Sequence, residues 1–139
     1  MKTKLFLLTF LTFLCSCEQE GDLTQDAVPI VVDQPNTVNK YQGVFLPTSG
    51  INGTGIVKIY LENNQYKLAL ENYSISSGPD LKMYLSKSNT PTEFVNLGNL
   101  NSEIVYFIPQ NVDLKQYKFV LIHCQQYNHL FAVAELIQN

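Results

Sequence analysis

The sequence predicts an all-β fold, a single antiparallel β-sandwich of about eight short strands that follows a lipoprotein signal and a flexible tether. Three observations predict it. From Tyr41 onwards, short apolar or alternating runs are separated by closely spaced turn residues, which is typical of sandwiches and barrels. The chain has 8 Tyr and 8 Phe, residues that pack well on pleated surfaces. Its 139 residues leave room for one domain with an appendage.

Residues 1–16 have the layout of an export signal. A short basic start, Met1–Lys4, precedes the run Leu5–Leu14, which is apolar except for two threonines. A membrane-spanning helix needs about 20 apolar residues, so this run is too short to span a bilayer. The alternatives are a buried core segment that happens to end in two cysteines, and export without a lipid.

The stretch Leu14, Cys15, Ser16, Cys17 resembles the lipobox of bacterial lipoproteins. The resemblance implies cleavage after Ser16 and acylation of Cys17, with diacylglycerol and palmitate-type chains that attach the protein to a lipid bilayer without spanning it. We therefore expect a lipid-anchored, extracytoplasmic protein of the cell envelope, at an outer membrane or the cell surface.

Residues 17–40 are predicted to be the lipidated cysteine and an acidic tether. Its residues 18–40 contain Pro29 and Pro35 and lack sustained periodicity. As a flexible coil they would span roughly 25 Å. The short apolar run Val28–Val32 remains open as an edge strand of the domain, because the two prolines disfavour a strand without excluding one.

The net charge and the cysteine content exclude some classes of function. The chain has 9 basic and 12 acidic residues, a formal charge of −3, and removal of Lys2 and Lys4 leaves 7 against 12, or −5. No basic stripe exists for phosphates, so nucleic acid is not expected as a partner. With Cys15 removed and Cys17 acylated, only Cys124 remains. An internal disulfide is then excluded, and an unpaired thiol outside the cytoplasm is unusual.

The domain, residues 41–139, divides into strands by alternation and turn residues. In the second strand Gly55, Val57, Ile59 and Leu61 share one face, and a tight turn over 62–65 joins it to the next strand as a hairpin. The predicted strands are Gln42–Pro47, Gly55–Glu62, Tyr66–Tyr73, Leu81–Ser86, Phe94–Leu97, Ile104–Pro109, Lys118–Cys124 and Leu130–Ile137.

Cys124 is the main candidate for chemistry. Alternation groups it with Val120 and Ile122, which favours a small, inert core residue. The alternative is a redox thiol at the junction of a strand and a loop, activated by His123 or His129. Both interpretations stay open at this point.

Other chemistry is less supported. The spacing H-C-x-x-x-x-H from His123 to His129 resembles a copper-ligand loop, but a second suitably placed His is missing and only Met83 could serve as axial ligand. Zinc normally takes four Cys or His ligands, and only three candidates exist. Asp80 could act as an acid or a ligand, but an Asp after Gly-Pro more often bonds its own turn. No metal site and no hydrolytic constellation are predicted.

Several segments together resemble the DM-thirteen domain family, an electron-transfer family. The clearest is Gly78–Ser86, GPDLKMYLS, which is similar to its Gly-Pro-Asp-Leu, hydrophobic, Tyr-Leu-Ser signature. The opening strand (Tyr41, Gly43, Phe45), the small residues Gly53–Ile56 and the closing segment Val120–Leu136 agree with the family as well. Cys124 occupies its cysteine position, while His123 replaces an aromatic residue and Ala132 a glycine.

The resemblance implies an extracytoplasmic β-sandwich in which Cys124 alone has a redox or electron-transfer role. The sequence itself offers His123, His129 and Asp80 as supporting residues. No cofactor is expected in this chain, and haem, flavin or copper would belong to a redox protein partner. The alternative function is a non-catalytic binding or structural surface lipoprotein that uses exposed Tyr60, Tyr73 and Tyr84. An enzyme proper is less favoured, because no acid, base and nucleophile converge. A monomer is expected.

Overall fold

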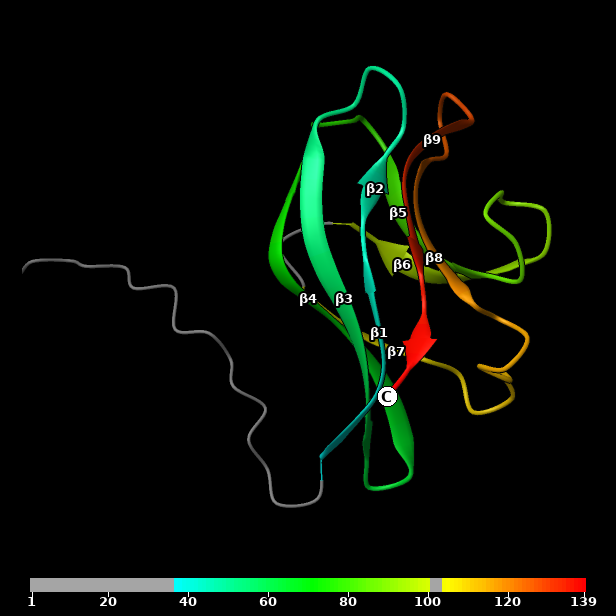
Figure 1. Ribbon diagram of the computed structural model, residues 1–139. Coiled ribbons are helices and arrows are strands. Elements are labelled where there is room, and N and C mark those ends of the chain that lie inside the picture. The colour runs from blue at the N-terminus through cyan, green and yellow to red at the C-terminus, as the bar shows by residue number, and fades with distance from the viewer. Residues whose placement is uncertain (1–36, 101–103) are drawn as a thin grey trace, which may run out of the picture. The chain divides into compact units, whose positions relative to one another are not determined.

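The structure, a computed structural model, describes residues 37–100 and 104–139. Ten strands form two antiparallel five-stranded sheets, which confirms the predicted β-sandwich (Figure 1). Within the described part, no helix is long and apolar enough to cross a membrane. The strands are β1 (Val38–Val44), β2 (Leu46–Pro47), β3 (Gly53–Glu62), β4 (Gln65–Ile75), β5 (Leu81–Ser86), β6 (Phe94–Asn99), β7 (Val105–Phe107), β8 (Phe119–Cys124), β9 (His129–Glu135) and β10 (Ile137–Gln138).

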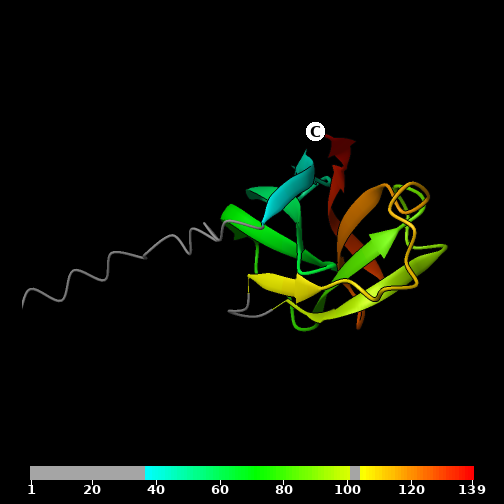
Figure 2. The same cartoon turned by 90° about the horizontal axis from the view of Figure 1, so that it is seen from below.

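Sheet 1 has the strand order β10-β1-β3-β4-β7, and sheet 2 the order β2-β9-β8-β5-β6. Figure 2 shows the two layers from below, with β8 and β9 on the opposite side from the β3–β4 hairpin. Apolar side chains of both sheets fill the space between them. The inward-facing residues of sheet 2 include Met83 and Leu85 on β5, Val120 and Ile122 on β8, and Ala132 and Ala134 on β9.

Two predicted strands are each split between the sheets. Gln42–Pro47 becomes β1 and β2, because the chain passes from sheet 1 to sheet 2 at Phe45, whose ring is buried in the core. Leu130–Ile137 becomes β9 and β10, because buried Leu136 separates the two and its N–H donates to the Lys118 carbonyl. The structure therefore has ten strands among the described residues where about eight were predicted, because two predicted strands each divide at a crossing.

The β3–β4 hairpin forms as predicted. Glu62 pairs with Gln65, and the two turn residues Asn63 and Asn64 have φ values of 48° and 62°. Asn tolerates this left-handed region better than other residues with side chains, and such turns match the twist of paired strands. Val57 and Ile59 face the core from β3, as the alternation predicts.

Several predictions concern residues outside those described. The signal over residues 1–16, the acylation site Cys17 and the open segment Val28–Val32 all lie there. At the other end of the tether, β1 begins at Val38, three residues before the predicted start of the domain at Tyr41.

Candidate functional site

Cys124 is the last residue of β8 and lies between two partner strands. Its register partners are Leu81, the first residue of β5, and His129, the first residue of β9. The side chain faces the core with Val120 and Ile122 and is 0% exposed. The thiol is therefore fully covered in this structure, which agrees with the alternation in the sequence.

The turn that follows Cys124 is tied to the Gly-Pro-Asp turn before β5. The N–H of Gln125 donates to the Asp80 carbonyl at 2.9 Å, and that of Asn128 to the Gln125 carbonyl at 3.3 Å. The side chains of residues 125–128 are all exposed, and Asn128 has a φ of 48°. A short, exposed turn in a left-handed conformation thus adjoins the buried thiol.

Gly78 lies in close contact with core side chains at this end of the sandwich. A Cβ at Gly78 would lie 2.7 Å from Cδ2 of Leu81 and 3.1 Å from Cζ of Phe131. Both neighbours belong to the core cluster that contains Cys124. A larger residue at Gly78 would therefore displace the side chains of Leu81 and Phe131, which pack in the same core cluster as the thiol.

The two histidines take different places. His129 is opposite Cys124 in register, is exposed, and meets the Phe131 ring edge-on with centroids 5.5 Å apart. His123 precedes Cys124 on an alternating strand, so it lies on the outer face of sheet 2, away from the thiol. The structure brings His129 to the thiol's end of the strands and separates His123 from it.

His123 belongs to a stack of three rings on the outer face of sheet 2. Tyr84 stacks on Phe94 with centroids 4.1 Å apart and on His123 with centroids 5.4 Å apart. Tyr84 is 2% and His123 4% exposed, although neither belongs to the core cluster. The planar imidazole packs here as a flat aromatic ring would. Sequence reasoning missed the stack; its only signal was the alternation that places Tyr84 and His123 outward.

Burial controls the charge of His123. Desolvation, with a smaller effect from His129, lowers its pKa below the ordinary histidine value, and a side-chain hydrogen bond with Asn128 opposes this shift. Its Nδ1 is buried without a hydrogen-bond partner. The neutral imidazole is therefore favoured, and a buried ring nitrogen without a hydrogen-bond partner is costly.

Asp80 is an ion-pair and turn residue. Its carboxylate lies 2.6 Å from Nζ of Lys82, and its carbonyl accepts from Gln125. No group of three or more His, Cys, Asp or Glu side chains is arranged to hold a metal ion within residues 37–100 and 104–139. Asp80 thus lies in the turn before β5, but its carboxylate pairs with Lys82 on β5 and not with the backbone of its own turn.

The prediction that Tyr84 is exposed was wrong, because its ring is buried in the stack. Tyr60 and Tyr73 are half-buried, and burial raises the pKa of Tyr73 to about 12. The Tyr60 hydroxyl donates to Oε1 of Glu71 at 3.1 Å. Tyr127, at 68% exposed in the turn after Cys124, is the more accessible aromatic residue that sequence reasoning passed over.

Comparison with known proteins identifies the family. The model described as "Electron transfer DM13" matches residues 46–136, from β2 to the end of β9, which includes the Gly78 turn and Cys124. The searches of curated proteins and of solved structures found no match. Because the matched region covers more than half of the chain, this protein belongs to the DM13 electron-transfer domain family.

Proposed function

We propose that the protein is an electron-transfer domain of the cell envelope, anchored through acylated Cys17, in which Cys124 is the redox group. The observation that carries the proposal is the family membership, which extends over the only thiol in the described residues. The lipobox-like segment and the short apolar leader support the anchor.

The thiol must become accessible before it can react. Cys124 is fully buried, but the next four residues form an exposed turn held by few backbone hydrogen bonds. Short exposed turns open with a smaller free energy than the whole domain requires. Opening of residues 125–128 would uncover the end of β8 while leaving the sandwich intact.

The proposed chemistry is thiol–disulfide exchange with a partner. Cys124 loses its proton to solvent, and its thiolate attacks one sulfur of an acceptor disulfide, whose other sulfur leaves as a thiolate. A donor dithiol then acts on the mixed disulfide: its first sulfur displaces the acceptor's remaining sulfur, and its second closes the donor's disulfide and releases Cys124. Two electrons thereby pass from the donor to the acceptor.

The test is the rate at which residues 18–139, with Cys124 as their one thiol, react with an aryl disulfide. We expect a slow reaction that Cys124→Ser abolishes. Asn128→Ala should accelerate it about tenfold, because alanine is disfavoured at positive φ by 1–2 kcal/mol and loses the contact with His123.

Asn64→Ala is the matched control. Asn64 has a similar φ of 62°, but it lies in the β3–β4 turn, far along the chain from the thiol. It should lower the stability of the whole domain without accelerating the reaction of Cys124. Equal acceleration by both variants, or no reaction below global unfolding, would refute the role of the turn.

A second candidate is the binding or structural lipoprotein. The complete burial of Cys124 favours it, because buried cysteines are usually inert. On this hypothesis Cys124→Ser would affect stability alone, and exposed groups such as Tyr127 would contact the partner. The reaction with the aryl disulfide separates the two candidates.

A further inference from the structure

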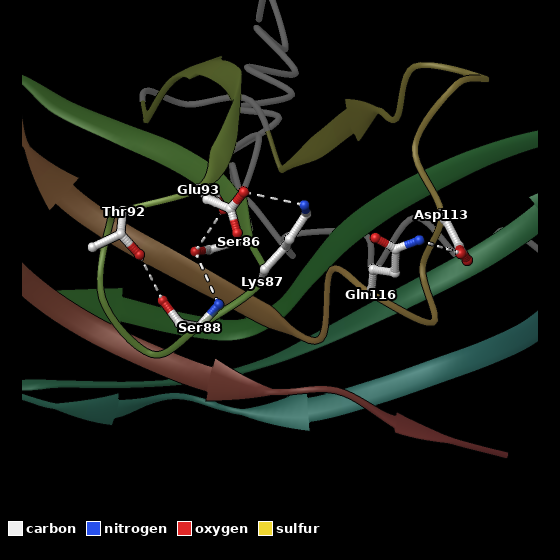
Figure 3. Close-up of polar contacts among 7 residues, drawn as sticks. All are labelled: Ser86, Lys87, Ser88, Thr92, Glu93, Asp113 and Gln116. Carbon is white, nitrogen blue, oxygen red and sulfur yellow. Dashed lines mark hydrogen bonds and ion pairs between the residues drawn. The ribbon is translucent and has the colours of Figure 1, made fainter.

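The loop between β7 and β8 has an ordered backbone and carries two exposed lysines. Val112 and Leu114 anchor the loop in the core. Asp113 organises the turn: its carboxylate accepts from the Lys115 N–H at 2.9 Å and from Nε2 of Gln116 at 3.1 Å, and its carbonyl accepts from the N–H groups of Gln116 and Tyr117. Figure 3 shows Asp113 and Gln116 meeting across this turn. Lys115 and Lys118 are both exposed at its surface.

These lysines differ from most others in the domain. Lys58, Lys67, Lys82 and Lys87 each lie within ion-pair distance of an Asp or Glu carboxylate. Among the described residues, Lys115 and Lys118 form no such pair. Their ammonium groups therefore remain available to an external anion.

Both lysines line one pocket of about 420 Å³ at the edge where the two sheets meet. Leu114, Leu136 and Ile137 form apolar parts of its wall, and Tyr41 also lines it. Burial, with the nearby Tyr66 and Asp113, raises the pKa of Tyr41, so its hydroxyl stays a neutral donor. Lys115, Lys118, Glu135 and Gln138 complete the lining.

We propose that this pocket binds a phosphate ester with a short carbon chain, of the glycerol phosphate type. The two ammonium groups and the Tyr41 hydroxyl would hold the phosphate oxygens, since lysine is a common phosphate ligand. The apolar wall would hold the carbon chain, and Glu135 would accept from a ligand hydroxyl. The proposal goes beyond electron transfer and does not depend on Cys124.

A lipid headgroup and a soluble phosphate ester share this chemistry. The preference for a headgroup rests on the anchor proposed at Cys17: Tyr41 lies three residues after the start of β1, about 10 Å along an extended strand. The predicted tether joins the domain at that point. A headgroup bound there would hold this edge of the sandwich at the membrane surface.

The experiment uses residues 18–139 and two probes. Glycerol 3-phosphate is titrated by calorimetry, and vesicles of phosphatidylcholine with or without phosphatidylglycerol are tested by co-sedimentation. The variant K115Q/K118Q should weaken binding about tenfold or more, since each lysine near an anionic surface contributes about 1 kcal/mol. Both side chains are exposed, so the thermal midpoint should not change.

The matched control is K58Q/K87Q, which changes the net charge equally at two lysines that are already paired with Glu71 and Glu93 (Figure 3 shows the second pair). It should alter binding by less than about twofold. Binding to phosphatidylglycerol vesicles alone identifies a headgroup site, and binding of glycerol 3-phosphate as well shows that the pocket takes the soluble ester. Equal weakening by both double variants, or no binding of either probe, would overturn the proposal.

Discussion

The two faces of sheet 2 are buried to different extents and by different kinds of side chain. The inner face packs aliphatic side chains and Cys124 against sheet 1, and its members have no polar group except that thiol. The outer face buries Leu121, Tyr84 and His123 without a second sheet. On that face a row of register partners runs across β2, β9, β8 and β5: Leu46, Val133, Leu121 and Tyr84. The row ends at Tyr84, which also belongs to the ring stack.

Each face of sheet 2 carries one group that could take part in chemistry, and the two groups differ. The inner face holds a thiol that is fully buried. The outer face holds an imidazole with an unpaired Nδ1 that is neutral because it is buried. The adjacent residues Cys124 and His123 thus lie on opposite faces. The turn after them bonds the Asp80 carbonyl through the Gln125 N–H and contacts His123 through Asn128.

The largest expected effect is on the inner face. Ile122→Ala should lower the free energy of unfolding by about 2–5 kcal/mol, because the side chain is fully buried and a cavity would remain. Val133→Ala on the half-buried outer face should cost much less. Urea denaturation measures both, and equal losses would remove the distinction between the faces.

The second-largest expected effect is a loss of stability from a change in the packing around Gly78. Gly78→Ala should cost about 1–3 kcal/mol, since the added Cβ would overlap Leu81 and Phe131. The neighbouring exposed Ser77→Ala should stay within about 0.5 kcal/mol of the parent. Thermal and urea unfolding compare the pair, and an unchanged Gly78→Ala protein would show that the core next to Cys124 is loosely packed.

The outer stack should contribute a smaller amount. Phe94→Leu keeps an apolar side chain but loses the ring contact with Tyr84, and should destabilise the domain by about 0.5–1.5 kcal/mol. Tyr127→Leu, at a solvent-exposed aromatic, serves as control and should have almost no effect. If the two variants behave alike, stacking does not explain the burial of Tyr84.

The pH dependence should be the mildest effect. Because the pKa of folded His123 lies below that of the unfolded chain, the unfolded chain binds a proton first as the pH falls. Stability is therefore complete above the ordinary histidine pKa and declines from there down to the lowered folded pKa. The urea midpoint measured from about pH 8 to pH 5 should fall less in His123→Gln than in the parent. His129→Gln should keep the fall of the urea midpoint. If that fall disappears in His129→Gln and persists in His123→Gln, His123 is not the group responsible.

Local sequence patterns could predict much of the fold. The alternation from Val120 to Cys124 predicts which residues face the core, and the Asn63–Asn64 turn predicts the hairpin. The strand switch at Phe45 could not be predicted, because it depends on which sheet each half of the strand pairs with. The ring stack depends on the pairing of β5 with β8, which are far apart in sequence, so the burial of Tyr84 was missed.

The central claim is that Cys124 reacts through local opening of the turn at residues 125–128. The most direct test is the alkylation rate of Cys124 in residues 18–139 at increasing, sub-denaturing urea concentrations. We predict that the rate at low urea is nearly independent of urea, because opening a short turn exposes little surface. A rate that rises with urea as steeply as global unfolding does, from the lowest concentrations, would contradict the claim and leave Cys124 as a structural core residue.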